Sequence, residues 1–135
     1  MIQRTPISVR FYELDPYGHL NHSVYIQYFE VGRIDMFAAF GWTLGGLAGL
    51  GTQVVVSSIE TTFLAPGREA DELVVESWVE EVKRVTTTFG QRIVRGETVL
   101  AEQRVVGACL NLEGRPMRFP AEMSTAMLGA LRTSQ

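Results

Sequence analysis

The sequence predicts an α+β fold in which a curved antiparallel sheet of about five strands wraps around one long central helix. Three observations lead to this prediction. Residues 22–40 are mostly apolar and end at Gly41, four strand-like segments follow, and short turn sequences separate the last three of them. Short connections favour antiparallel pairing. An apolar helix needs cover on most sides, so the sheet must curl around it.

The first element is predicted to be a strand that begins at Ile7. There Ile7, Val9 and Phe11 alternate with polar residues, which is the period of a strand. The strand is expected to stop at the turn sequence Asp15-Pro16-Tyr17-Gly18, because proline fixes one φ angle and glycine permits a positive one.

The helix is predicted to run from about His22 to about Phe40, with Asn21 as its N-cap. Its polar residues form one narrow stripe, and Asp35 lies outside it. Glu30 and Arg33 are spaced as an i,i+3 ion pair. The stripe consists of Ser23, Gln27, Glu30 and Arg33.

Four strands are predicted after the helix, at residues 54–63, 73–82, 85–94 and 99–112. Glycines at 45, 46, 49 and 51 mark the segment before them as a loop or a broken short helix over an opening. A short helix over about 121–131 has a weaker pattern.

Composition limits the classes of function. The 135 residues fit one domain, residues 1–135, and the net charge of −3 without a Lys/Arg run argues against a nucleic-acid binder. No secretory segment or membrane span is recognised, so a cytoplasmic protein is expected. Cys109 is the single cysteine; it excludes an intrachain disulfide and is expected in the core.

The segment Asp15–Tyr25 combines two parts of an acyl-transfer site. A carboxylate lies in a turn, six residues before the helix N-cap. A helix N-terminus presents unpaired amides and a partial positive charge, which suit a developing oxyanion. A nearby carboxylate can attack a carbonyl or activate water.

The motif Leu14-Asp-Pro-Tyr-Gly-His-Leu-Asn-His-Ser-Val-Tyr25 resembles the signature of hotdog-fold acyl-CoA thioesterases, in particular the 4-hydroxybenzoyl-CoA thioesterase-like family. Glu30 and Arg33 match a recurrent pattern of that family. The step from His19 to Asn21 resembles the acyl-carrier-protein branch, although Tyr17 stands where the plant-type branch has Asn. The likeness covers roughly residues 4–112.

The resemblance implies a role for each matching residue. Asp15 would be the nucleophile or general base, the backbone amide of His22 would polarise the carbonyl, and Tyr25 would line the acyl pocket. Coenzyme A would be part of the substrate, with no metal or other cofactor. The substrate-binding candidates are Tyr17, Gly18, His19, Asn21, His22 and Tyr25.

Other interpretations of these residues stay open. Asp15 could merely open an Asx-turn, Asn21 could serve only as a cap, and His19 could brace the loop. Asp15, His19 and His22 are a weak metal set. Arg92 and the Lys83-Arg84 pair could meet phosphates or face solvent.

The alternatives to a thioesterase are a hotdog dehydratase or hydratase and a non-catalytic acyl-thioester-binding protein. The spacing of Asp15 and His19 argues against the hydratase signature. The open edge of a five-stranded sheet favours a homodimer or homotetramer. Acyl group and carrier, coenzyme A or acyl carrier protein, are not determined by the sequence.

Overall fold

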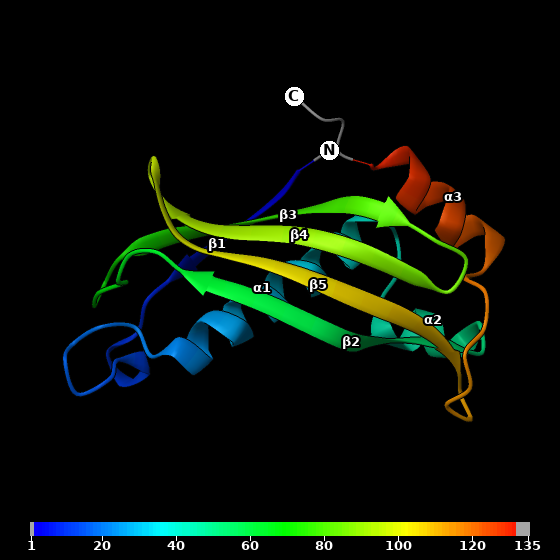
Figure 1. The fold of residues 1–135 in the computed structure, drawn as a ribbon, viewed down its shortest axis with the longest axis horizontal. Helices are drawn as coiled ribbons and strands as arrows, with labels where there is room; N and C mark the ends of the chain where they lie inside the picture. Colours follow the sequence, from blue (N-terminus) through cyan, green and yellow to red (C-terminus); the bar gives the residue numbers. More distant parts are fainter. Residues whose placement is uncertain (1, 132–135) are drawn as a thin grey trace.

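The computed structural model describes residues 2–131. A long helix and a five-stranded sheet dominate it (Figure 1). The strands are β1 (Gln3–Ser8), β2 (Thr52–Phe63), β3 (Glu72–Val82), β4 (Thr86–Arg95) and β5 (Thr98–Asn111). The helices are the 3-10 turn η1 (Phe11–Glu13), α1 (His22–Ala39), α2 (Leu44–Gly49) and α3 (Ala121–Gly129).

The predicted α+β architecture is confirmed. The sheet has the order β1-β3-β4-β5-β2, and all neighbours are antiparallel. In Figure 1 α1 lies behind the sheet, with the loop that precedes it at one end and α2 at the other. The four later strands lie within two residues of their predicted bounds.

The prediction for the first strand was wrong in its position. β1 ends at Ser8, and Phe11 begins a 3-10 turn with its side chain 73 % exposed. The chain turns because the Glu13 carboxylate accepts the Arg10 N–H at 2.9 Å, and Val9 N–H bonds Asp71 O beyond the end of the ladder. The alternation of apolar and polar residues in the sequence continues beyond Ser8, where the pairing of β1 with β3 ends.

The helix α1 packs on β1, β3 and β4, and its bounds confirm the prediction. The predicted Glu30–Arg33 ion pair was wrong, because Arg33 is buried and donates to Gln91 Oε1 at 3.0 Å. Gln91 in turn donates to Phe29 O and Ser77 Oγ. Burial lowers the pKa of Arg33.

The glycine-rich segment forms the short helix α2, one of its two predicted forms. Thr43 Oγ1 caps it by accepting Gly46 N–H at 3.0 Å. Leu47 is buried in a core cluster with Met36 and Val79, at the end of α1 opposite to the Asp15 turn. Within one chain α2 therefore lies away from that turn, and its place over an opening stays a prediction.

Cys109 is buried in the same cluster, as predicted. No helix within residues 2–131 is long and apolar enough to cross a membrane.

Candidate active site

Residues 13–21 form a short hairpin that carries Asp15 at its turn. Asn21 N–H bonds Glu13 O at 2.9 Å, and Asp15 N–H bonds His19 O at 2.7 Å. Gly18 N–H closes the turn onto Asp15 O at 3.0 Å, and Gly18 has a φ of +77°, which glycine adopts without strain. The turn is thus held by backbone bonds on both sides of Asp15.

The Asp15 carboxylate is held through one oxygen. Oδ1 accepts Tyr17 N–H at 2.8 Å and His19 N–H at 3.1 Å, so Asp15 does open an Asx-turn. Among residues 2–131, no donor bonds the second oxygen, Oδ2. The side chain is therefore oriented by the turn while one oxygen stays free to meet a substrate or a water molecule.

The N-terminus of α1 follows directly. Asn21 is the N-cap, as predicted: its Oδ1 accepts Ser23 N–H at 3.0 Å, and its carbonyl accepts Val24 N–H at 2.9 Å. The His22 N–H has no acceptor among the described residues. The family resemblance assigns the His22 amide to the thioester carbonyl, and this amide is free to donate a hydrogen bond, unlike those of Ser23 and Val24.

Tyr25 links α1 to the loop of residues 64–71. Its hydroxyl donates to Ala65 O at 3.2 Å and accepts Gly67 N–H at 2.9 Å. Burial raises the pKa of Tyr25, and the Gly67 donor and Arg95 partly offset this. The Tyr25 ring meets the Phe63 ring edge to face, with 5.3 Å between the ring centroids. The role of Tyr25 in an acyl pocket stays a prediction.

The remaining candidates lie around the same turn. Tyr17 is 85 % exposed, and the His22 side chain is exposed as well. His19 is half-buried, and its backbone pairs with Arg68. Within residues 2–131, no group of three or more His, Cys, Asp and Glu side chains is arranged to hold a metal ion.

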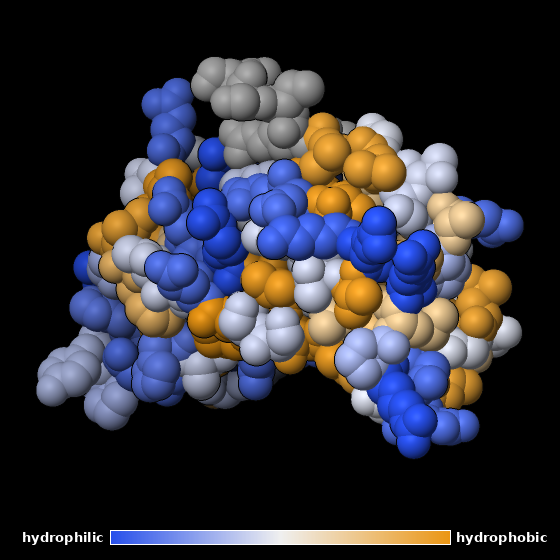
Figure 2. All heavy atoms as spheres, turned by 45° about the vertical axis from the view of Figure 1, so that its right-hand side comes forward, coloured by the Kyte–Doolittle hydropathy of each residue, from blue (hydrophilic) through white to orange (hydrophobic). Residues whose placement is uncertain are grey.

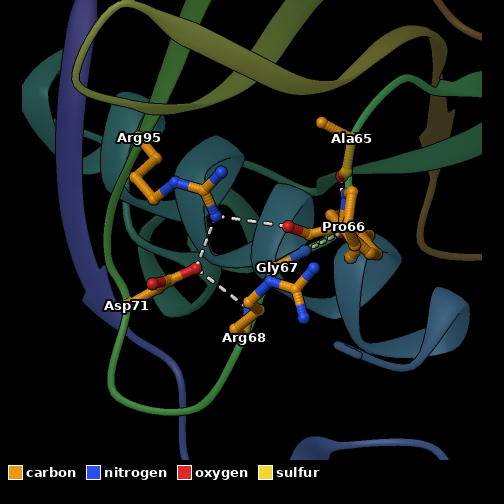
Figure 3. Close-up of polar contacts among 7 residues, drawn as sticks. Ala65, Pro66, Gly67, Arg68, Asp71 and Arg95 are labelled. Atoms are coloured by element: carbon orange, nitrogen blue, oxygen red, sulfur yellow. Dashed lines mark hydrogen bonds and ion pairs between the residues drawn. The ribbon is translucent and has the colours of Figure 1, made fainter. Parts of the chain in front are cut away.

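Three residues near the turn were missed by the sequence reasoning: Gly67, Asp71 and Arg95. Leu20 N–H bonds Gly67 O at 2.7 Å, and Arg95 and Asp71 join the two ends of that loop (Figure 3). The only signal in the sequence was Ala65-Pro66-Gly67, which indicates a turn and nothing about its neighbours.

A cleft of about 350 Å³ lies on the face of the sheet away from α1. Trp78, Arg92 and Arg104 line it, and none of its lining residues belongs to the Asp15 turn or to α1. Arg92 pairs there with Glu76 and lies over the Trp78 ring, and Lys83 pairs with Glu81. These cations already have partners on the protein surface.

Within residues 2–131, the site combines an unbonded carboxylate oxygen on Asp15 with an unbonded amide on His22, seven residues later at the start of α1. This is the arrangement that acyl transfer requires: a base or nucleophile, and a donor for the charge that develops on the carbonyl oxygen.

Comparison with known proteins agrees with this chemistry. The profile described as "Thioesterase-like superfamily" matches residues 9–127. The chain is 30 % identical over 125 residues to "Acyl-CoA thioesterase YbgC" of Haemophilus influenzae, which covers 90 % of each chain. It is 27 % identical over 128 residues to "Acyl-acyl carrier protein thioesterase ATL3, chloroplastic" of Arabidopsis thaliana, covering 93 % of this chain and 67 % of that protein.

Among solved structures, a probable thioesterase from Bartonella henselae superposes with a TM-score of 0.85 at 26 % identity. The match covers 89 % of this chain and all of that one.

Proposed function

The chain belongs to the thioesterase-like superfamily and is an acyl-CoA thioester hydrolase with the hotdog fold, and we propose that Asp15 and the N-terminus of α1 form its catalytic centre. The observation that carries this proposal is the pairing of two unused groups. Asp15 Oδ2 has no donor and His22 N–H has no acceptor among residues 2–131, whereas the N–H groups of Tyr17, Gly18 and His19 are all bonded within the turn.

In the proposed reaction the thioester carbonyl oxygen accepts the His22 N–H. The partial positive charge of the helix N-terminus stabilises the negative charge that develops there. Asp15 either attacks the carbonyl carbon or removes a proton from the attacking water. If Asp15 attacks, the C–S bond breaks to leave an acyl anhydride on Asp15, and water then hydrolyses it to the free acid and the Asp15 carboxylate. If Asp15 activates water, the water oxygen adds to the carbonyl carbon, and the C–S bond breaks to give the acid directly. On both routes the thiolate leaves and takes up a proton.

The Asx-turn positions Asp15 for this reaction rather than competing with it. Because Oδ1 accepts Tyr17 N–H and His19 N–H, the turn orients the carboxylate, and Oδ2 accepts from neither of these donors. We assign the exposed Tyr17 ring and the His19 side chain to substrate binding at the rim.

The acyl group is proposed to lie beside Tyr25 and Phe63. Phe63 is half exposed on β2 and contacts Tyr25 one turn into α1, so an acyl chain can extend along this apolar surface from the His22 amide. Coenzyme A is proposed as the carrier and the cytoplasm as the compartment, although one similar protein carries a name that specifies acyl carrier protein.

A homodimer, or a homotetramer built from two dimers, is proposed as the working form. β2 is a twelve-residue strand at one edge of the sheet, and it exposes Val56, Ile59 and Phe63. In Figure 2 the lower margin, the side on which β2 lies in Figure 1, is hollowed and hydrophobic residues gather above the hollow. A long apolar edge strand is normally covered by pairing.

The test of the catalytic proposal is Asp15→Asn. The amide keeps the acceptor oxygen of the Asx-turn but removes the negative charge that attack or proton removal needs. We expect turnover of the best acyl-CoA to fall by at least about a hundredfold, the lower scale for loss of a general base. The Michaelis constant and the melting temperature should change little.

Thiol release is measured across short, long and aromatic acyl-CoAs and one acyl carrier protein thioester. His19→Ala is assayed in parallel: a large loss of turnover there would make His19 a catalytic partner instead of only a substrate-binding residue. If Asp15→Asn keeps turnover within a few fold of wild type, Asp15 is not the catalytic carboxylate and Glu30 becomes the next candidate.

A further inference from the structure

The loop of residues 64–71 supports the catalytic turn from the side. Its Gly67 carbonyl accepts Leu20 N–H at 2.7 Å, and its Arg68 pairs with His19 as an isolated antiparallel bridge. Leu20 lies between Asp15 and the free amide of His22 in the chain. A shift of this loop therefore moves both parts of the proposed catalytic centre.

The same loop is tied to the chain before the turn. Val9 N–H donates to Asp71 O at 3.0 Å, and Ala70 N–H donates to Val9 O at 3.2 Å. Ala70 has a φ of +64°, a left-handed conformation that an L-residue keeps only where its surroundings hold it. The loop is thus a bridge between the end of β1 and the catalytic turn.

Arg95, the last residue of β4, holds this loop across its mouth. Its Nη1 donates to Pro66 O at 3.2 Å and to Asp71 Oδ2 at 2.7 Å, and the same Oδ2 accepts Arg68 N–H at 2.9 Å (Figure 3). One guanidinium nitrogen and one carboxylate oxygen therefore join three points of the loop, on both sides of Gly67.

This ion pair is too accessible to contribute much to global stability. The side chain of Arg95 is 36 % exposed and that of Asp71 is 20 % exposed, and pairs of this kind contribute little to unfolding free energy. Its geometric effect is larger, because misplacing reacting groups by about 1 Å can cost about a hundredfold in rate.

We propose that Arg95 and Asp71 are positioning residues for thioester hydrolysis, which clamp the 64–71 loop so that it holds Asp15 and the His22 amide in register. The inference rests on the proposed function of that turn. It assigns no contact with the substrate to either residue: they act through Gly67, Arg68 and Leu20.

The test uses Arg95→Gln and Asp71→Asn. Glutamine loses the charge and cannot reach Pro66 O and Asp71 together. Asparagine still accepts Arg68 N–H but loses the anion. We expect each variant to lower kcat by about tenfold or more, with KM within about twofold and the melting temperature nearly unchanged. Arg95→Lys should restore part of kcat, because the ammonium can again pair with Asp71.

The matched control is Arg104→Gln, which removes the exposed ion pair with Glu80 at 3.1 Å on the other face of the sheet. It should keep wild-type kcat. Hydrogen exchange gives the readout that is independent of activity: the Leu20 amide, bonded to Gly67 O, should exchange faster in Arg95→Gln than in wild type or Arg104→Gln.

Two outcomes would overturn the proposal: a kcat of Arg95→Gln within twofold of wild type, or unchanged exchange at Leu20. Failure of the proposed function is seen separately, in Asp15→Asn. If Asp15→Asn is active while Arg95→Gln is slow and its Leu20 exchanges faster, the clamp is retained and the identity of the catalytic carboxylate is wrong.

Discussion

Two tyrosine hydroxyls of α1 are buried near the catalytic turn and must stay protonated there. Burial raises the pKa of Tyr28 above its ordinary value of 10.0, and the Glu13 carboxylate, which accepts its O–H at 2.6 Å, raises it further. Burial also raises the pKa of Tyr25. In both cases the folded state favours the neutral, protonated phenol.

This linkage predicts alkaline destabilisation. Since the native pKa of Tyr28 lies above the unfolded one, its contribution to stability is complete below about pH 10 and is lost as pH rises further. Tyr28→Phe should therefore lower stability near neutral pH, because the bond to Glu13 is lost, but reduce the fall in stability between about pH 9 and 11.

Urea unfolding at fixed protein concentration over this pH range measures both effects. Equal slopes for Tyr28→Phe and wild type would show that Tyr28 does not carry the alkaline sensitivity.

At the scale of elements, α1 approaches the sheet closely through Gly32. A Cβ atom there would lie 2.6 Å from Val75 Cγ1 and 2.9 Å from Ser77 Oγ, both on β3. Gly32→Ala should therefore destabilise the protein by about 1–3 kcal/mol, the usual cost of overpacking a core, despite the better helix propensity of alanine.

The matched control is Gly49→Ala in α2, where a Cβ would meet nothing within 4 Å. It should be neutral or slightly stabilising. Denaturant midpoints at one protein concentration give the comparison, and a Gly32→Ala variant as stable as wild type would mean that α1 can shift away from β3 without cost.

The elements that the sequence predicted well are those fixed by local patterns. Asn21 capped α1 and Gly41, with a φ of +92°, ended it, because capping and helix termination depend on a few adjacent residues. Strand β1 was misplaced because alternation alone cannot show where pairing stops. The contacts that stop it, from Arg10 to Glu13 and from Val9 to Asp71, involve a side chain and a loop 62 residues away.

At the scale of the molecule, the same division separates the predicted from the unpredicted parts of the site. The Asp15 turn depends on bonds to residues two and four positions away, so it could be inferred. The support from the 64–71 loop could not, since Gly67 meets Tyr25 across 42 residues and Arg95 meets Pro66 across 29. Arg33 likewise looked like a surface residue until Gln91, 58 residues away, was placed beside it.

The exposed apolar residues of the whole chain also have a consequence for assembly. Val31 and Ile34 on α1 are each nearly half exposed, and so are Val56 and Ile59 on the edge strand β2. The sequence predicted a helix that needs cover on most sides, and within residues 2–131 α1 packs chiefly on β1, β3 and β4. We propose that a second copy docked along β2 covers these exposed residues.

Ile59→Lys tests this assembly directly. Wild type is expected to show at least twice the chain mass of 15.0 kDa in light scattering at micromolar concentration. A lysine at an apolar contact must be desolvated on association, so the dissociation constant should rise by at least about tenfold, equal to about 1.4 kcal/mol. Thr62→Lys, which puts the same charge on the opposite face of β2, should remain associated.

If association completes the site, turnover of Ile59→Lys falls as protein is diluted and recovers at high concentration. A wild-type chain that is monomeric and still active would contradict both the dimer and the shared site.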